Sequence, residues 1–217
     1  MKLLREVNET VQTLFEEANG KKNLYLSGTF MQAAIANRNK RIYPVDILRK
    51  ESERYISENI QRKNAWGELN HPSGPNINLD RVCLRTLELH QSGNDFIGKA
   101  IVTPTPMGDI VKGLVESGGQ LGVSTRALGT LKPCKDNAGV NEVQDDLRLL
   151  AIDCVGDPSA PNAWVDGIME DIEYFLNPRT GKFAEQAKKT IKKMSRKQLE
   201  ESKLKLFEEF LNNVKYK

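Results

Sequence analysis

One stretch of the chain restricts the fold more than any other. Residues 147–155 are almost continuously apolar, and only Arg148 and Asp153 interrupt the run. A short apolar run of this kind is typical of a β-strand buried on both faces. The fold must therefore cover this strand on two sides. It must also supply a partner for Asp153, because a buried carboxylate without one is strongly unfavourable.

The remaining strand signals predict an α+β domain with mostly antiparallel strands. Residues 24–35 alternate as a strand, and residues 121–131 form a second strand that carries Ser124. Residues 79–90 and 96–102 flank the polar segment 91–95, a pattern typical of a β-hairpin. Strands joined by short turns, with a few helices, are typical of the α+β class.

Three helices are expected before residue 120. Pro44 suits the first turn of a helix that runs to about Gln61, and a second helix is expected from Met107 to Glu116. Residues 1–18 carry apolar side chains at helical spacing and end at Asn19-Gly20. We therefore divide the chain into a helical N-terminal segment (1–22), a central domain (23–176) and a basic helical tail (177–217).

Composition excludes several classes of protein. The chain has 217 residues, 39% of them apolar, and no run approaches the roughly 18 apolar residues that span a bilayer. The start of the chain carries charges too early for a secretory signal, so we expect the protein to stay in the cytoplasm. Three cysteines without a CxxC pair suit reduced thiols. The lysines of the tail lack interleaved aromatic residues, which argues against nucleic-acid binding.

Two local stretches carry candidate reactive side chains. His71 lies between Asn70 and Pro72, and Pro72 restricts His71 to extended backbone. Ser124 follows a Gly-rich approach that favours tight backbone geometry and an open side chain. A serine becomes a nucleophile when a base removes its proton, and the chain has only two histidines. His90 lies at the polar end of a hairpin strand and should be exposed, so His71 is the better base.

Five segments in register resemble one known family. Together they are similar to the prohead core proteases of tailed bacteriophages of the myovirus type, which are distant relatives of herpesvirus assemblin. The segments are Gly28–Ala33, Asn37–Pro44, Gly67–Pro72, Gly122–Gly129 and Gly156–Pro161.

The resemblance implies a fold and an activity. The fold would be a small, closed or nearly closed, mostly antiparallel β-barrel with helices around it. The activity would be that of a serine endopeptidase that needs no cofactor and cleaves scaffold or core and capsid proteins, and also itself, after Glu in aliphatic-x-Glu sequences. It would act in the host cytoplasm, inside the assembling prohead.

The resemblance also assigns roles to residues. Ser124 would be the nucleophile, His71 the base and Asp153 the third member of a triad. Backbone N–H groups of Arg126 and Ala127, or the Arg126 guanidinium, would stabilise the oxyanion.

Alternatives remain at each level. Asp153 could instead pair with Arg126 or cap a turn. Glu68 and His71 have an E-x-x-H spacing, but Gly67 and Pro72 argue against the helix that a metal site of this kind needs. The protein could be an inactive scaffold or core protein that associates through its helical tail, or it could bind nucleic acid through the lysines of residues 188–197.

Overall fold

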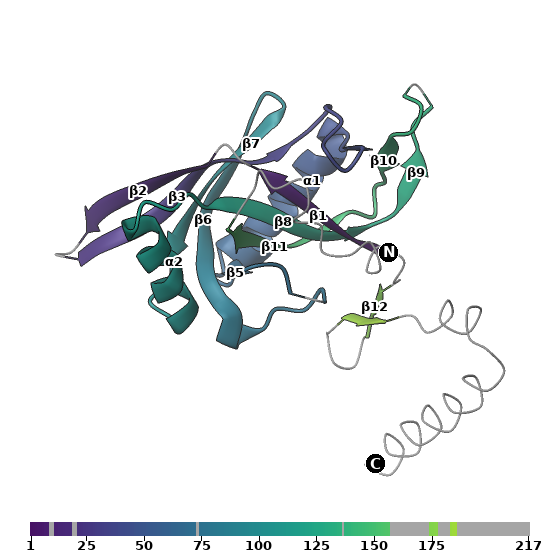
Figure 1. The fold of residues 1–217 in the computed structure, drawn as a ribbon. Helices are drawn as coiled ribbons and strands as arrows, with labels where there is room; N and C mark the ends of the chain where they lie inside the picture. Colours follow the sequence, from purple (N-terminus) through teal and green to yellow (C-terminus); the bar gives the residue numbers. More distant parts are fainter. Residues whose placement is uncertain are drawn as a thin grey trace, which may run out of the picture.

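A computed structural model describes most of the first 156 residues and two short later segments. The described residues are 1–8, 11–18, 21–72, 74–135, 137–156, 174–177 and 183–185. The Gly156–Pro161 segment beyond its first residue, and almost all of the predicted helical tail, lie outside this part. The core is built from two sheets that meet near residue 154 (Figure 1).

The larger sheet has five antiparallel strands in the order β2-β3-β7-β6-β5. The hairpin predicted around residues 91–95 is confirmed, and Gly93, with φ of 62°, supplies the left-handed turn residue. The strands are β2 (Val11–Ala18), β3 (Lys21–Gln32), β5 (Trp66–Glu68), β6 (Val82–Ser92) and β7 (Asp95–Val102).

The second sheet holds the apolar strand identified in the sequence. Its antiparallel strands are β1 (Lys2–Asn8), β8 (Gly122–Gly129) and β11 (Arg148–Val155), with β8 in the middle. All eight residues of β8 are buried, and β11 is buried from Ala151 to Val155, which confirms the prediction for this strand. A parallel bridge between Leu69 and Cys154 joins β11 to the end of β5, so the two sheets are adjacent.

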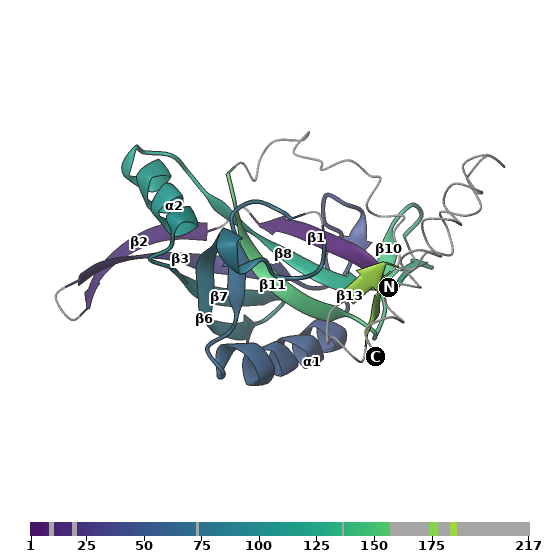
Figure 2. The same cartoon turned by 90° about the horizontal axis from the view of Figure 1, so that it is seen from below.

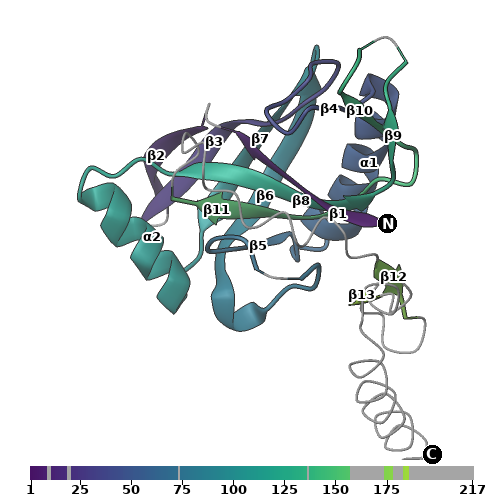
Figure 3. The ribbon, with the colours of Figure 1, turned by 45° about the vertical axis from the view of Figure 1, so that its right-hand side comes forward.

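Two small sheets complete the strand structure. The first contains β4 (Arg41–Ile42), β10 (Asn141–Val143) and β9 (Leu131–Pro133). The second pairs β12 (Tyr174–Leu176) with β13 (Phe183–Glu185). Figure 3 shows β12 and β13 next to the N-terminal end of β1, where the Tyr174 N–H donates to the Met1 carbonyl over 3.1 Å.

Both helices predicted inside the central domain are confirmed. Helix α1 (Val45–Tyr55) continues as the π-helical turn η1 (Ile56–Ile60), and Pro44 precedes it as expected. Helix α2 (Pro106–Glu116) begins at Thr105, whose hydroxyl accepts the Gly108 N–H over 3.2 Å as a side-chain cap. Figure 2 shows α1 below the strands and α2 above them, near the end where β2 and β3 project.

The predicted N-terminal helix is wrong, because residues 2–8 and 11–18 form β1 and β2. Leu3 and Leu4 are both buried, since both faces of β1 are covered, and this burial hides the alternation that normally marks a strand. Pairing with β8 and β3 then overrides the local helical spacing.

The barrel expectation also needs correction. The strands are mostly antiparallel as predicted, but hydrogen-bonded pairing within the described ranges gives separate sheets and no closed barrel. Two α-helices in the described part of the chain flank these sheets. The fold is therefore α+β, with β5 and β11 forming the junction at which the candidate site lies.

Candidate active site

Ser124 and Asp153 lie directly opposite each other in the ladder between β8 and β11. Residues paired in this way project to the same face of a sheet, and so do residues two positions apart on one strand. Ser124, Arg126 and Asp153 therefore share one face. All three are completely buried. The ladder thus brings together two of the predicted triad residues from positions 29 residues apart in the sequence.

The chain leaves β5 and carries His71 over this face. Asn70, with φ of 60°, has left-handed backbone, and its N–H donates to the Cys154 carbonyl over 2.8 Å. The turn places His71 Nδ1 3.5 Å from Asp153 Oδ2. The segment is held again at Pro72, whose carbonyl accepts a hydrogen bond of 2.5 Å from the Arg5 guanidinium. The structure therefore brings His71 to Asp153, as the triad hypothesis requires.

The reactive atoms of this site are enclosed. The Ser124 side chain has no exposed surface, although the sequence predicted an open one, and the His71 side chain is only 9% exposed. Ser124 Oγ and both ring nitrogens of His71 have no hydrogen-bond partner among the described residues. Buried polar atoms normally have partners, and unpartnered ones are frequent at reactive sites. A peptide can therefore reach Ser124 only when surface that is buried here becomes accessible.

The Arg126 guanidinium connects the parts of the site. Its Nε and Nη2 donate to the two Asp153 oxygens over 3.0 and 3.2 Å, and Nη2 also donates to Glu68 Oε1 over 2.9 Å. Its Nη1 donates to the carbonyls of Gly74 and Asn76 over 2.9 and 3.2 Å. The pairing of Asp153 with Arg126, weighed above as an alternative to the triad, is present together with the His71 contact.

Glu68 is a second buried acid in this cluster. Its side chain is completely buried, and its backbone N–H donates to Asp153 Oδ1 over 2.9 Å. Its carboxylate accepts two hydrogen bonds of 3.1 Å from Asn78 and lies 3.6 Å from Arg81 Nε. Glu68 lies in β5 rather than on a helix, and no group of three or more potential metal ligands occurs within the described ranges.

The residues expected to stabilise an oxyanion lie inside the ladder. Arg126 and Ala127 have β1 on one side and β11 on the other, where ladder hydrogen bonds normally use the backbone N–H groups. The Arg126 guanidinium has the five acceptors described above. An oxyanion role for either residue would therefore require the ladder or the guanidinium contacts to rearrange when substrate binds.

Burial and neighbouring charges shift the pKa values of several groups around the cluster. Burial lowers the pKa of Arg5, and the positive charge of Arg126 lowers it further. Burial raises the pKa of Tyr55, and the negative charge of Asp153 adds to this rise. A hydrogen bond to Cys154, together with burial, raises the pKa of the Cys83 thiol. The Cys83 thiol beside the site is therefore neutral.

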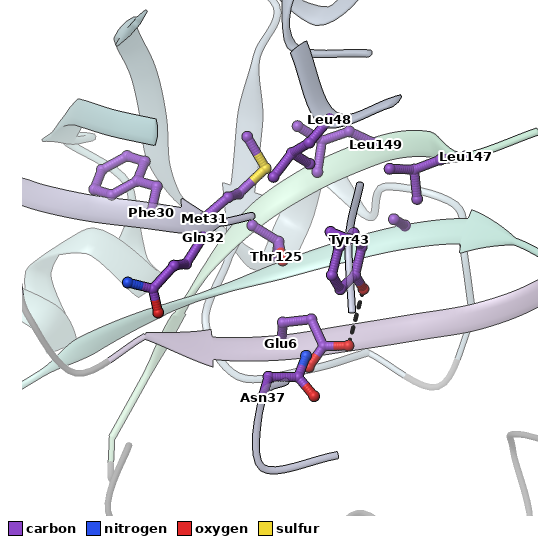
Figure 4. Close-up of a pocket in the computed structure, with 11 residues that line it drawn as sticks. Glu6, Phe30, Met31, Gln32, Asn37, Tyr43, Leu48, Thr125, Leu147 and Leu149 are labelled. Carbon is purple, nitrogen blue, oxygen red and sulfur yellow. Dashed lines mark hydrogen bonds between the residues drawn. The ribbon is translucent and has the colours of Figure 1, made fainter. Parts of the chain in front are cut away.

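A pocket of about 90 Å³ lies on the opposite face of β8. Thr125 and Ala127 line it, so Thr125 points away from the Ser124 face, as its place in the strand predicted. Figure 4 shows the Tyr43 hydroxyl donating to Glu6 at the polar rim, over 2.8 Å. The apolar part of the lining comes from Phe30, Met31, Leu48, Leu147 and Leu149. This pocket is separated from His71 and Ser124 by the sheet.

Comparison with known families decides the classification. A family model described as "Prohead core protein serine protease" matches residues 8–173. The chain belongs to this family. The resemblance found in the sequence is therefore confirmed, and the protein is a member of a bacteriophage prohead protease family.

A named relative and a solved structure agree with this classification. The chain is 40% identical over 148 residues to the prohead core protein protease of Enterobacteria phage T4, an alignment that covers 67% of this chain and 69% of the relative. It also matches the structure of the bacteriophage T4 capsid assembly protease with a TM-score of 0.66 and 33% identity, over 72% of this chain and 98% of the other. No helix among the described residues has the length and apolar character needed to cross a membrane.

Sequence reasoning missed the residues that support the site. The sequence suggested Glu68 as a metal ligand or as the acid to test after Asp153, and it placed Arg5 in a predicted helix. Asn78 and Arg81 had no assigned role. Their contacts join residues far apart in the sequence, such as Arg5 with Pro72 and Arg126 with Glu68. The one available signal was the charge of Glu68, an acid between apolar neighbours in the stretch that carries His71.

Proposed function

We propose that this chain is a serine endopeptidase that cleaves scaffold or core proteins and capsid proteins during maturation of a phage prohead. One observation carries the proposal: His71 lies 3.5 Å from Asp153, and Asp153 lies opposite Ser124 on one buried face. Membership of the prohead core protease family supports the same activity. The relative from phage T4 is itself named a capsid assembly protease.

The proposed mechanism is acyl transfer. His71 Nδ1 faces Asp153, which leaves Nε2 to remove the proton from Ser124 Oγ as the oxygen attacks the scissile carbonyl. The imidazolium then protonates the leaving amine, and a water molecule activated by His71 releases the acyl group. Asp153 stabilises the positive charge that His71 carries between these steps. This mechanism uses side chains of the chain alone.

Substrate entry would be a separate step. The chain around His71 is held by hydrogen bonds from Arg5 to the Pro72 carbonyl and from Arg126 to the Gly74 and Asn76 carbonyls. We place the opening of this segment before acylation, because Ser124 has no exposed surface. Lids that open in this way are frequent in enzymes that exclude water from the reacting groups.

The expected cleavage site follows Glu in an aliphatic-x-Glu sequence, and self-cleavage is expected at Glu201 or Glu208. Both residues lie outside the described part of the chain. Matching sequences within it include Leu4-Arg5-Glu6, which β1 holds in a ladder with β8. A protease needs an accessible, extended substrate, so we expect sites in such elements to be resistant. The partners would be core and capsid proteins, and the reaction would occur inside the assembling prohead.

The decisive experiment compares the wild type with Ser124→Ala on a phage scaffold protein. We expect new fragments with the wild type and none with the variant, a loss of several orders of magnitude in rate. The melting temperature of the variant should not fall, because the buried Oγ has no partner and its removal leaves no unsatisfied atom. Fragments formed at the wild-type rate by a folded Ser124→Ala protein would exclude the proposed nucleophile.

A further inference from the structure

Three buried charges lie behind the His71 ring. Asp153 and Glu68 are the two acids, and the Arg126 guanidinium lies between them with hydrogen bonds to both. None of the three side chains is exposed. Charges removed from water in this way are unfavourable unless they are paired and fully hydrogen-bonded. Apolar side chains of similar volume often fill such a space at equal or lower free energy, so the cluster points to a role beyond stability.

The contacts of Arg126 provide a geometric reason. Its hydrogen bonds to Asp153 hold the carboxylate beside His71. Its hydrogen bonds to the Gly74 and Asn76 carbonyls hold the segment that follows His71. The Glu68 backbone N–H also donates to Oδ1 of the Asp153 carboxylate. One guanidinium thus fixes both the carboxylate that faces the ring and the segment that carries the ring. An arginine suits this place because its donors are arranged in a rigid planar fork.

The charges provide an electrostatic reason. The three fully buried side chains carry one net negative charge; a protonated His71 would place a positive charge beside Asp153, as the partly exposed Arg81 does beside Glu68. The transition state of serine proteolysis creates this imidazolium. Removing the negative charge of Glu68 should disfavour the protonated His71 ring. Removing the positive charge of Arg126 should favour the protonated ring.

We propose that Glu68 and Arg126 are positioning residues that, with Asp153, orient His71 and set how readily its ring takes up a proton. The inference rests on the proposed function only for the role of His71 as the base. It assigns Arg126 to the His71 side of the site rather than to the oxyanion. It also separates Glu68 from Asp153: Asp153 faces the ring, and Glu68 acts through Arg126.

Other charged groups adjoin the ring and must stay constant in the test. The Arg5 guanidinium from β1 binds the Pro72 carbonyl, and Arg81 binds the Leu69 carbonyl over 2.8 Å while facing Glu68. Tyr55 and Cys83 approach Asp153 from α1 and β6 in neutral form. None of these residues changes in the variants below.

The test follows the titration of the two histidine rings by NMR in a Ser124→Ala background, which requires no proteolysis. His90 is exposed in β6 and serves as an internal reference in every spectrum. Glu68→Gln should lower the titration midpoint of the His71 ring by about one pH unit, and Arg126→Gln should raise it by a similar amount. The double variant removes one charge of each sign and should return the midpoint close to its starting value. Glu16→Gln is the matched control, since its carboxylate pairs with Lys99 in the other sheet.

The opposite signs distinguish this inference from a purely structural role. If Glu68 and Arg126 only supported packing, the two substitutions would move the His71 titration midpoint in the same direction or leave it unchanged. Either result would overturn the proposal. An unmoved His71 midpoint in folded Glu68→Gln would overturn it alone, even if Arg126→Gln does not fold. With Ser124 intact, the acid limb of the pH profile of kcat/KM should move as the NMR midpoints do. If the midpoints move as expected while the wild type cleaves no scaffold protein, the charge cluster stands and the proposed function fails.

Discussion

The Asn70 backbone N–H donates to the Cys154 carbonyl over 2.8 Å, so the residue before His71 is joined to the residue after Asp153. This bond fixes His71 and Asp153 relative to each other through the backbone. It forms at the junction of the two sheets, where Leu69 and Cys154 make a parallel bridge. The 3.5 Å separation of His71 and Asp153 therefore depends on the junction as well as on the two side chains.

The left-handed backbone of Asn70 gives the first prediction. Glycine adopts φ near 60° freely, whereas a β-branched residue at this φ is destabilised by about 1–2 kcal/mol. We expect Asn70→Gly to retain much more activity than Asn70→Val, because the valine displaces His71 from Asp153. The measurement is kcat/KM on a scaffold protein, with circular dichroism to show that both variants fold. Equal activities would mean that the turn does not position the base.

A glycine at the junction gives the second prediction. A Cβ added to Gly67 would lie 1.9 Å from the Ile152 carbonyl oxygen, so β5 and β11 must separate to admit it. We expect Gly67→Ala to lower the free energy of unfolding by about 2–4 kcal/mol and to reduce activity.

Gly113 in α2 provides the matched control, since a Cβ there would meet nothing within 4 Å. Gly113→Ala should stabilise the protein by up to about 1 kcal/mol, because alanine favours a helix over glycine. Urea denaturation measures both variants. A Gly67→Ala protein as stable as Gly113→Ala would contradict the close packing of β5 on β11.

Alkaline pH gives the third prediction. Burial raises the pKa of Tyr43 well above its ordinary value of 10.0, and the Glu6 carboxylate raises it further. A group with a raised folded-state pKa stabilises the fold fully below the unfolded value and loses this contribution as pH rises toward the folded value. Stability should therefore fall above about pH 10.

The variant Tyr43→Phe isolates this effect, because it removes the titrating hydroxyl and leaves Tyr55 in place. It should be less stable than the wild type near neutral pH, since the hydrogen bond to Glu6 is lost. Its stability should then fall less steeply above about pH 10. Urea denaturation at several pH values between 8 and 11 measures both slopes, and parallel slopes would refute the assignment to Tyr43.

The end of the central domain gives the fourth prediction. Phe183 exchanges two hydrogen bonds of 3.0 Å with the Asn76 side chain, so β13 holds the segment that follows His71. The boundary expected at residue 177 would remove this contact. We expect a chain that ends at Glu185 to retain most of its kcat/KM and one that ends at Asn177 to lose activity severalfold.

Asn76→Ala in the full-length chain is the companion variant, since it removes the same two hydrogen bonds without shortening the chain. Its activity should fall in parallel with that of the chain ending at Asn177. If both retain full activity, β13 has no part in positioning His71. If the chain ending at Glu185 is also inactive, residues beyond it contribute to the active form.

The elements predicted correctly are those specified by local sequence. Helix α1 follows from Pro44 and its apolar stripe, and the β6–β7 hairpin follows from its turn residues. The burial of β11 follows from its composition. These features need only neighbouring residues, so periodicity and turn chemistry are sufficient to find them.

Most of the features that were missed depend on distant pairing, although β2 pairs with the adjacent strand β3. Residues 2–8 become a strand because β8 pairs with them, and β8 begins more than a hundred residues later. The same holds for Arg126, whose acceptors Glu68 and Gly74 lie more than fifty residues before it. The candidate triad residues come from a family resemblance, whereas the charged side chains that contact them became visible only in three dimensions.

The order of strands in the sheet β1-β8-β11 determines when the candidate site can form during synthesis. Its middle strand carries Ser124, one neighbour is synthesised about 120 residues earlier, and the other is completed only at Val155. At the usual rate of synthesis, roughly 5–20 residues per second, the first strand waits several seconds for its partner. A nascent chain that has not reached residue 153 lacks the acid that faces His71. The candidate site therefore cannot assemble in a growing chain before residue 153 has been added.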